Sequence, residues 1–411
     1  MTFSPKTYIS TFLFLLLLGS HSFSQTANEA FNRGLHLMAA REYRAAANSF
    51  SEAIERVPYF YEAWFERGRC HQHLNEFEKS IVDFNGALEH NPGFTDAFYH
   101  RAISYAALGR HTEAFNDYNK TLELDPRHVQ AYLKRSEINI RNSRIDPAIE
   151  DLSKVLEIGH RNANVLFTRG KLYNQRGNKD AAMQDFTSAI GLDPEHAELR
   201  VERGLIFIAN ERFAEAATDF TVAIEQGINT MQIFQWRADA YYRSGQFEKA
   251  IEDYTRLINT FRQRNEETQY RRALSYFYAG EYEAAARDLT RVIGLNRNHE
   301  EAYIFRAEAY HKLGREAQAM MDYRLIMRIN PNNALAYERR GLMYLETGKL
   351  NEALEDLNQA IRLNPTAESL YIRATIYASQ NNTRSACQDL RQAAAMGHKE
   401  AQEKFHIYCP R

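Results

Sequence analysis

The sequence is poor in cysteine and proline and almost neutral in charge. Its 411 residues include only three Cys and nine Pro, and 51 Lys and Arg stand against 53 Asp and Glu. Three cysteines are too few for a disulfide-stabilised scaffold, and a net charge of −2 argues against a strongly basic, nucleic-acid-binding surface. A hydrophobic content of 44% is too high for a disordered chain. The composition therefore predicts a chain with a packed core and no nucleic-acid partner.

Long apolar runs are absent except near the N-terminus. The run Ile9–Leu18 follows the single charged side chain Lys6, and small residues lead from it to Ser24. This order is typical of a secretory signal peptide cleaved after Ser24. The run is too short to cross a bilayer, which takes about 20 residues, and the alternative is an uncleaved N-terminal anchor. We therefore expect residues 1–24 to be a signal peptide, and the mature chain from Gln25 to be periplasmic or secreted, without a membrane span.

The sequence also lacks the common motifs of enzymes. Its 14 histidines are dispersed, and the zinc, redox, serine-nucleophile and phosphate-loop motifs (H-E-x-x-H, C-x-x-C, G-x-S-x-G and G-x-x-x-x-G-K-[ST]) do not occur. Acidic pairs are abundant, but they are typical of solvated helix surfaces. We therefore expect no catalytic residues, no cofactor and no metal site.

The sequence does contain a repeat of 34 residues, marked by two small residues in each unit. The first small residue recurs at Gly34, Gly68, Ala102, Ser136, Gly170, Gly204, Ala238, Ala273, Ala307, Gly341 and Ala374. The second stands twelve residues later, at Ala46, Ser80, Ala114, Ala148, Ala182, Ala216, Ala250, Ala285, Ala319, Ala353 and Ala386. Two small positions at a constant offset predict two helices in close contact.

Each repeat is predicted to be a helix, a tight turn and a second helix. An aromatic residue usually stands three residues after the first small residue, as at Tyr241, and an aromatic or Leu stands four after the second, as at Phe186 and Leu289. These spacings place apolar side chains on one helical face. Gly between the two helices, as at Gly177, can end the first helix in a left-handed conformation. Pro follows the second helix in six repeats.

These residues resemble the consensus of the tetratricopeptide repeat family. The resemblance implies an all-α, right-handed superhelical solenoid over residues 27–399, followed by a C-terminal cap helix and tail at residues 400–411. The eleven repeats are 27–60, 61–94, 95–128, 129–162, 163–196, 197–230, 231–265, 266–299, 300–333, 334–366 and 367–399.

Four features depart from this consensus. His71 and Asn139 occupy places where the inner aromatic residue belongs, the terminal Pro is missing from repeats 4, 6, 7 and 8, and repeat 7 has one extra residue near Arg262–Asn265. We expect looser or re-angled packing at the departing repeats. The likeliest local irregularity is expected near the extra residue of repeat 7.

Two of the three cysteines flank the C-terminal end of the array. The midpoint between Cys387 and Cys409 is His398, next to Gly397, where the chain must turn if the last repeat helix and the cap helix are antiparallel. A disulfide is then expected to close a loop of about 22 residues. The alternative is two free buried thiols. Cys70 is left unpaired and is expected to fill core space.

Arg and Asp recur with the same period. Ten repeats carry both an Arg one residue before the first small position and an Asp just before the second-helix aromatic or Leu. The Arg residues are Arg33, Arg67, Arg101, Arg135, Arg169, Arg203, Arg237, Arg272, Arg306, Arg340 and Arg373. The Asp residues are Asp83, Asp117, Asp151, Asp185, Asp219, Asp253, Asp288, Asp322, Asp356 and Asp389. An Asp stripe at a constant offset from the Arg stripe favours internal ion pairs over a phosphate-binding stripe, within or between repeats.

The resemblance implies that the first helices line a concave groove. Position 2 of the groove is often acidic, which the helix dipole favours in any case. Charges at the remaining groove positions balance, five acidic against five basic, so the groove is not expected to bind polyanions. Apolar candidates for partner contact are Phe31, Leu35, Met38, Tyr99, Ile103, Val201, Leu205, Ile208, Tyr270, Leu274, Phe277 and Tyr278. Such patches either contact another chain or pack against neighbouring helices.

These observations predict a non-enzymatic scaffold that binds a protein or peptide through its groove, outside the cytoplasm. The alternative is a structural subunit of a cell-envelope or secretion-related assembly, which would use the edges or the convex face. The partner and the oligomeric state are left open by the sequence.

Overall fold

The computed structural model describes residues 25–409. In that range the regular secondary structure consists of α-helices, without β-strands. The predicted signal peptide, residues 1–24, lies outside the described residues. The chain divides into two compact units, of which the first ends at Pro194 and the second begins at Glu195. None of the described helices is both long and apolar enough to cross a membrane.

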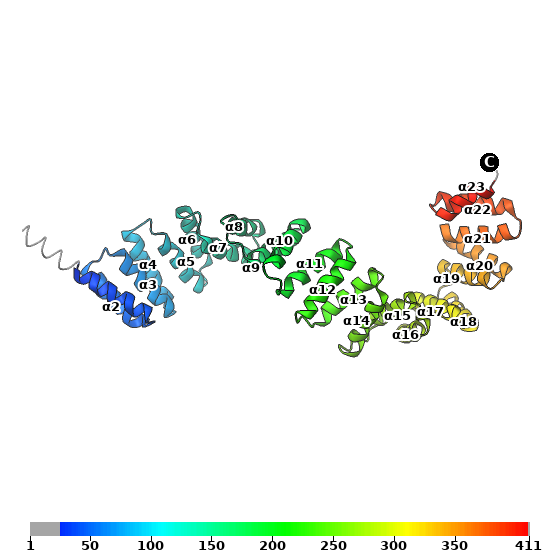
Figure 1. Ribbon diagram of the computed structural model, residues 1–411, viewed down its shortest axis with the longest axis horizontal. Helices are drawn as coiled ribbons and strands as arrows, with labels where there is room; N and C mark the ends of the chain where they lie inside the picture. The colour runs from blue at the N-terminus through cyan, green and yellow to red at the C-terminus, as the bar shows by residue number, and fades with distance from the viewer. Residues whose placement is uncertain (1–24, 410–411) are drawn as a thin grey trace, which may run out of the picture. The chain divides into compact units, whose positions relative to one another are not determined.

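The first unit consists of paired helices joined by short turns (Figure 1). It begins with a helix over residues 25–39. The helices that follow are α2 (Tyr43–Arg56), α3 (Tyr61–His73), α4 (Phe77–His90), α5 (Thr95–Ala107), α6 (His111–Leu124), α7 (Val129–Arg141), α8 (Ile145–Glu157), α9 (Ala163–Gln175) and α10 (Lys179–Leu192).

The second unit continues the same alternation and ends on a shorter helix. Its first seven helices are α11 (Ala197–Ala209), α12 (Phe213–Glu225), α13 (Met231–Arg243), α14 (Phe247–Asn259), α15 (Glu266–Tyr278), α16 (Tyr282–Leu295) and α17 (Glu300–Lys312). The remaining helices are α18 (Glu316–Ile329), α19 (Ala334–Glu346), α20 (Leu350–Leu363), α21 (Ala367–Ser379), α22 (Thr383–Ala395) and α23 (Lys399–Tyr408). The predicted solenoid of helical repeats is confirmed.

The small residues lie where the two helices of a repeat touch. A Cβ added to Gly170 on α9 would lie 2.7 Å from the ring of Phe186 on α10, and Gly204 stands in the same relation to Phe220. That separation is too short for two carbon atoms. A side chain at Gly170 or Gly204 would therefore force the ring or the helices of that repeat to shift.

The second-helix stripe forms the core of each repeat. Phe186, Phe220 and Tyr254 are fully buried, and Leu289 takes the same place in repeat 8. Burying one such side chain stabilises the fold by roughly 1.5–3 kcal/mol. Because the stripe recurs in every repeat, each repeat adds a similar block of core to the one before it.

The Arg and Asp stripes form ion pairs within repeats. Arg169 donates from Nε to Oδ2 of Asp185 at 2.8 Å and from Nη2 to Oδ1 at 2.7 Å. The ten Arg residues from Arg67 to Arg373 each pair with the Asp sixteen residues later. The Asp side chains are buried and the guanidinium groups are mostly covered, so the stripes are structural.

The third nitrogen of several of these Arg side chains reaches the preceding repeat. Nη1 of Arg169 donates to Oγ of Ser153 at 2.9 Å, and Nη1 of Arg306 donates to Oγ1 of Thr290 at 3.0 Å. One guanidinium thus ties its own repeat together and joins it to its neighbour. In repeat 1, where Ser49 replaces the Asp, Nε of Arg33 donates to the Ser49 hydroxyl at 3.1 Å.

The polar residues at two inner aromatic places contact the paired Asp of their own repeat. Nδ2 of Asn139 donates to Oδ2 of Asp151 at 3.1 Å. His71 places Nε2 3.6 Å from Oδ2 of Asp83, and its Nδ1 lies 2.8 Å from Glu76. These side chains therefore extend the polar network where other repeats have an aromatic ring.

The expectation of looser packing in repeats without the terminal Pro was wrong. In repeats 4 and 6 the second helix is followed instead by Gly159 and Gly227, whose φ angles of 99° and 104° suit glycine and turn the chain. In repeat 8, Oδ1 of Asn296 accepts from the backbone N–H of Asn298 at 3.0 Å and forms the turn. Within the second unit the sparsest junction between successive repeats, α18–α19, is one that contains Pro331.

The extra residue of repeat 7 lies in an irregular connection, as expected. After Thr260, the C-cap of α14, the chain is not helical until α15 begins at Glu266. Within this connection Arg262 adopts a left-handed φ of 56°. The backbone N–H of Gln263 donates to the Leu257 carbonyl at 2.9 Å, which anchors the loop to α14. The insertion is thereby absorbed before α15 begins.

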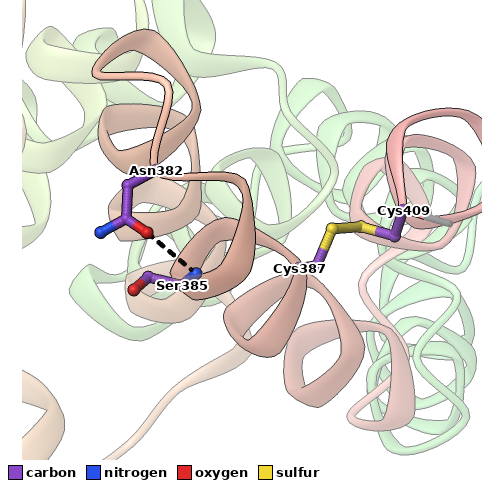
Figure 2. Close-up of a disulfide and its surroundings, with 4 residues drawn as sticks. All are labelled: Asn382, Ser385, Cys387 and Cys409. Atoms are coloured by element: carbon purple, nitrogen blue, oxygen red, sulfur yellow. Dashed lines mark hydrogen bonds between the residues drawn. A yellow bond between two sulfur atoms is a disulfide. The ribbon is translucent and has the colours of Figure 1, made fainter.

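A disulfide joins Cys387 on α22 to Cys409 at the end of α23, as Figure 2 shows. The bridge spans 22 residues and holds the last helix against the last complete repeat. The helix predicted to cap the array is α23, although it begins one residue earlier than expected, at Lys399. Cys70 is a buried free thiol.

Candidate partner-binding site

Five aromatic side chains form a connected group on α13, α14, α15 and α17 of the second unit, and we call this group the aromatic cluster. Its members are Tyr242, Phe247, Phe277, Tyr278 and Phe305. Ring centroids of Phe247 and Tyr278 lie 5.3 Å apart in a stacked pair, and those of Phe277 and Phe305 lie 5.3 Å apart edge to face. Tyr242 and Tyr278 are separated by 6.3 Å between centroids.

Most of the aromatic cluster is partly buried, but one of its side chains is exposed at the surface. Tyr278 is 50% exposed, whereas the other four rings are half-buried. Tyr278 is the last residue of α15, so its ring stands at the end of a first helix and packs on Phe247 at the start of α14. A large aromatic side chain held in this way presents apolar area that loses little freedom on contact with a partner.

The charged groups near the cluster have partners of their own. Glu308 lies 3.5 Å from Arg339, and Oδ1 of Asp239 accepts from the Tyr254 hydroxyl at 2.5 Å. Burial raises the pKa of Glu308 above its usual range, and Arg339 opposes that shift. Burial also raises the pKa of Tyr278, so its phenol is neutral at physiological pH. The arrangement suits apolar contact better than proton transfer.

Two of the predicted contact residues are not available to a partner. Tyr270 is 7% exposed and Leu274 is 5% exposed, and both belong to the core. The reason is that α15 and α17 contact each other, so side chains on this part of α15 face the neighbouring first helix instead of open space. The ring of Tyr270 packs 4.5 Å from that of His299, which corrects the expectation that Tyr270 is a groove anchor.

The candidates of repeat 1 are mostly packed as well. The ring of Phe31 lies 5.5 Å from that of Phe50 and 4.8 Å from that of Phe60. Met38 packs against a buried cluster that includes Cys70. Leu35 is 38% exposed, so it is the repeat 1 candidate with most surface to offer.

The candidates of repeats 3 and 6 are half-buried. Tyr99 packs its ring 4.6 Å from His128, and Ile103 lies one turn further along α5. On α11 the half-buried candidates are Val201, Leu205 and Ile208. These residues form smaller apolar surfaces without an exposed aromatic ring.

Three members of the cluster were not among the residues predicted from the sequence. Tyr242 occupies the place in repeat 7 that Phe277 occupies in repeat 8, so the repeat alignment could have found it. Phe247 begins a second helix and Phe305 lies beside the expected groove positions, so neither stands at a position assigned to the groove. Only the packing of three successive repeats brings them to Tyr278.

Metal binding has no support in the described part of the chain. Within residues 25–409 no three His, Cys, Asp or Glu side chains are grouped so that they could hold a metal ion.

Solved structures of other helical-repeat proteins are similar to this chain. A tetratricopeptide repeat protein from Parabacteroides merdae is 23% identical, with 60% of this chain and 99% of that chain covered and a TM-score of 0.47. Yeast Tom70 is 16% identical, covering 93% of this chain and 89% of its own, with a TM-score of 0.42. The first repeat domain of Spaghetti (RPAP3), solved with an HSP90 peptide, is 25% identical over 29% of this chain and 95% of its own, with a TM-score of 0.29.

Family models provide the assignment. No curated protein sequence matches this chain significantly. Four models, each described as a tetratricopeptide repeat, match residues 31–93, 95–128, 167–229, 234–263, 270–334 and 334–366. Together these segments cover well over half of the chain and fall on the helix pairs described above. The chain belongs to the tetratricopeptide repeat family.

Proposed function

We propose that this protein is a non-enzymatic scaffold that binds a protein or peptide partner through the aromatic cluster and acts outside the cytoplasm. The observation that carries the proposal is the stacked pair of Tyr278 and Phe247. Stacking on Phe247 fixes the Tyr278 ring, while half of the Tyr278 residue surface stays exposed to solvent. Aromatic side chains in such positions are the commonest anchors of protein interfaces.

Binding would use a surface that is already formed. Four half-buried rings hold Tyr278 in place, so little conformational entropy would be lost on contact. Smaller apolar surfaces on other first helices, such as those around Leu35 and Leu205, would add weaker contacts along the same chain. Several weak contacts on one chain raise the total affinity without a single strong site.

The location outside the cytoplasm rests on two features. Residues 1–24 have the layout of a signal peptide, and Cys387 and Cys409 form a disulfide of the kind that persists in oxidising compartments. Export is tested by sequencing the N-terminus of the protein in the periplasmic or secreted fraction. A mature N-terminus next to Gln25 is expected, and an intact N-terminus on cytoplasmic protein would contradict export.

Site-specific cross-linking tests the binding surface. A photoreactive phenylalanine analogue is placed at Tyr278, and in a matched variant at Met321, which is 63% exposed on the second helix α18. The proposal expects one partner to be cross-linked from position 278 and not from position 321. Cross-links from Met321 alone would instead favour a structural subunit that uses its convex face.

A further inference from the structure

A second candidate site lies at the C-terminal end of the second unit, away from the residues of the aromatic cluster. A cavity of about 370 Å³ is lined by α21, by the start of α22 and by one residue of α23. Its walls include Ala374, Ala386, Leu390 and the disulfide-bonded Cys387. This volume is within the range of roughly 300–1,000 Å³ that is usual for small-molecule sites.

The cavity lies where the short last helix meets α22. The first helices of the preceding repeats have 13 residues, whereas α23 has 10. The disulfide from Cys387 to Cys409 places the end of α23 beside the first half of α22 (Figure 2).

One positive charge stands in this apolar setting. Lys404 of α23 is the charged residue among those that line the cavity, and its Nζ lies 4.8 Å from the centre of the Tyr371 ring. No carboxylate in the described part of the chain lies within 4.0 Å of the Lys404 ammonium group. The nearby Glu368 lies 3.1 Å from Nε2 of His398, whereas Nδ1 of His398 accepts from the backbone N–H of Ala401 and lies 3.2 Å from Glu400.

The polar groups of the wall do not offer a competing acid. The hydroxyl of Thr375 donates to the Ile372 carbonyl at 2.7 Å, and Asn381 and Thr383 are uncharged. Thr383 is also the first residue of α22, and the positive end of a helix dipole favours anions. The electrostatic character of the cavity is therefore positive, while its walls are mostly apolar.

We propose that this cavity binds a small monocarboxylate with an apolar tail. The tail would lie against Ala374, Ala386 and Leu390, and the carboxylate would pair with the Lys404 ammonium group. A neutral molecule of the same shape would lose the ion pair, and an amine would be repelled. This site is separate from the aromatic cluster, so its test does not depend on the proposed partner binding.

Hexanoate serves as the probe, with hexanol as the neutral control. The full mature chain, with its disulfide formed, is labelled at alanine methyl groups and titrated while methyl chemical shifts are recorded. We expect saturable shifts confined to Ala374, Ala378 and Ala386, and much weaker ones with hexanol. The variant Lys404→Met should weaken hexanoate binding about fivefold or more, since it removes the charged partner.

A matched variant separates the cavity from general charge effects. Lys399→Met removes the same charge from the same helix at a residue that does not line the cavity, so it should bind hexanoate like the wild type. Circular dichroism of both variants confirms that each is folded. Equal binding by Lys404→Met and wild type, shifts scattered over alanines of other repeats, or no saturable shift would overturn the proposal.

Discussion

The hydroxyl of Tyr270 donates a hydrogen bond to Oε2 of Glu301, with 2.9 Å between the oxygen atoms. The two residues lie on successive first helices, α15 and α17, so the bond joins repeat 8 to repeat 9. Burial and then the Glu301 hydrogen bond raise the pKa of Tyr270, which keeps the donor protonated. Tyr270 is therefore part of the join between repeats and not a free anchor.

Replacing Tyr270 should separate packing from hydrogen bonding. Tyr270→Ala is expected to destabilise repeats 8 and 9 by about 3–5 kcal/mol because it removes a large core side chain. Tyr270→Phe keeps the ring and should cost only about 1 kcal/mol. Amide hydrogen exchange in α15 and α17 measures both effects. Wild-type protection in Tyr270→Ala would show that the ring is not part of the core.

The difference between Tyr270 and Tyr278 shows where prediction from sequence reached its limit. The repeat predicted which helices form, because contacts such as Gly170 with Phe186 join residues sixteen apart and recur in every unit. Exposure along α15 depends instead on how closely α17 approaches, which no spacing within one repeat encodes. Tyr270 and Tyr278 therefore had equal standing in the sequence, yet one is buried and the other is half exposed.

The pair of Arg169 and Asp185 should stabilise its repeat measurably. Asp185 is 4% exposed, so Asp185→Ala leaves a covered guanidinium without its main acceptor and should cost about 1–3 kcal/mol locally. Asp180→Ala removes the same charge from the exposed first turn of α10 and should cost less than about 1 kcal/mol. Hydrogen exchange in α9 and α10 compares the two. Equal effects would show that the ion pairs add nothing beyond surface charge.

His100 should make the first unit lose stability in mild acid. Burial, and then the positive charge of Arg69, lower the pKa of His100 from 6.5 to about 4. The unfolded chain thus binds a proton more readily than the folded chain, so stability is complete above pH 6.5 and falls as the pH drops toward 4. The loss is on the order of 3 kcal/mol.

The variant His100→Phe checks this pH dependence. It keeps a ring beside Phe65, whose centroid lies 5.3 Å from that of His100, but it cannot bind a proton. Denaturant midpoints are measured between pH 7 and pH 4 for both proteins. The midpoint of the variant should fall less than that of the wild type across this window. Parallel curves would show that His100 protonation does not oppose folding.

Thiol counting tests the cysteine arrangement. Cys70 is buried, and burial raises its pKa to about 12, so it should resist alkylation in the native protein. Cys387 and Cys409 are bonded to each other and should not react before reduction. The native protein should therefore show no reactive thiol, the unfolded but unreduced protein one, and the reduced protein three. Three reactive thiols without reductant would exclude the disulfide.

The central claim is that the aromatic cluster binds a partner, and the dissociation constant of the cross-linked partner tests it most directly. The constant is measured for the wild type, for Tyr278→Ala and for Met321→Ala, which removes a more exposed side chain elsewhere. Tyr278→Ala should weaken binding by about 2 kcal/mol, or roughly thirtyfold, with unchanged circular dichroism, while Met321→Ala should bind like the wild type. Unchanged affinity in Tyr278→Ala would contradict the account.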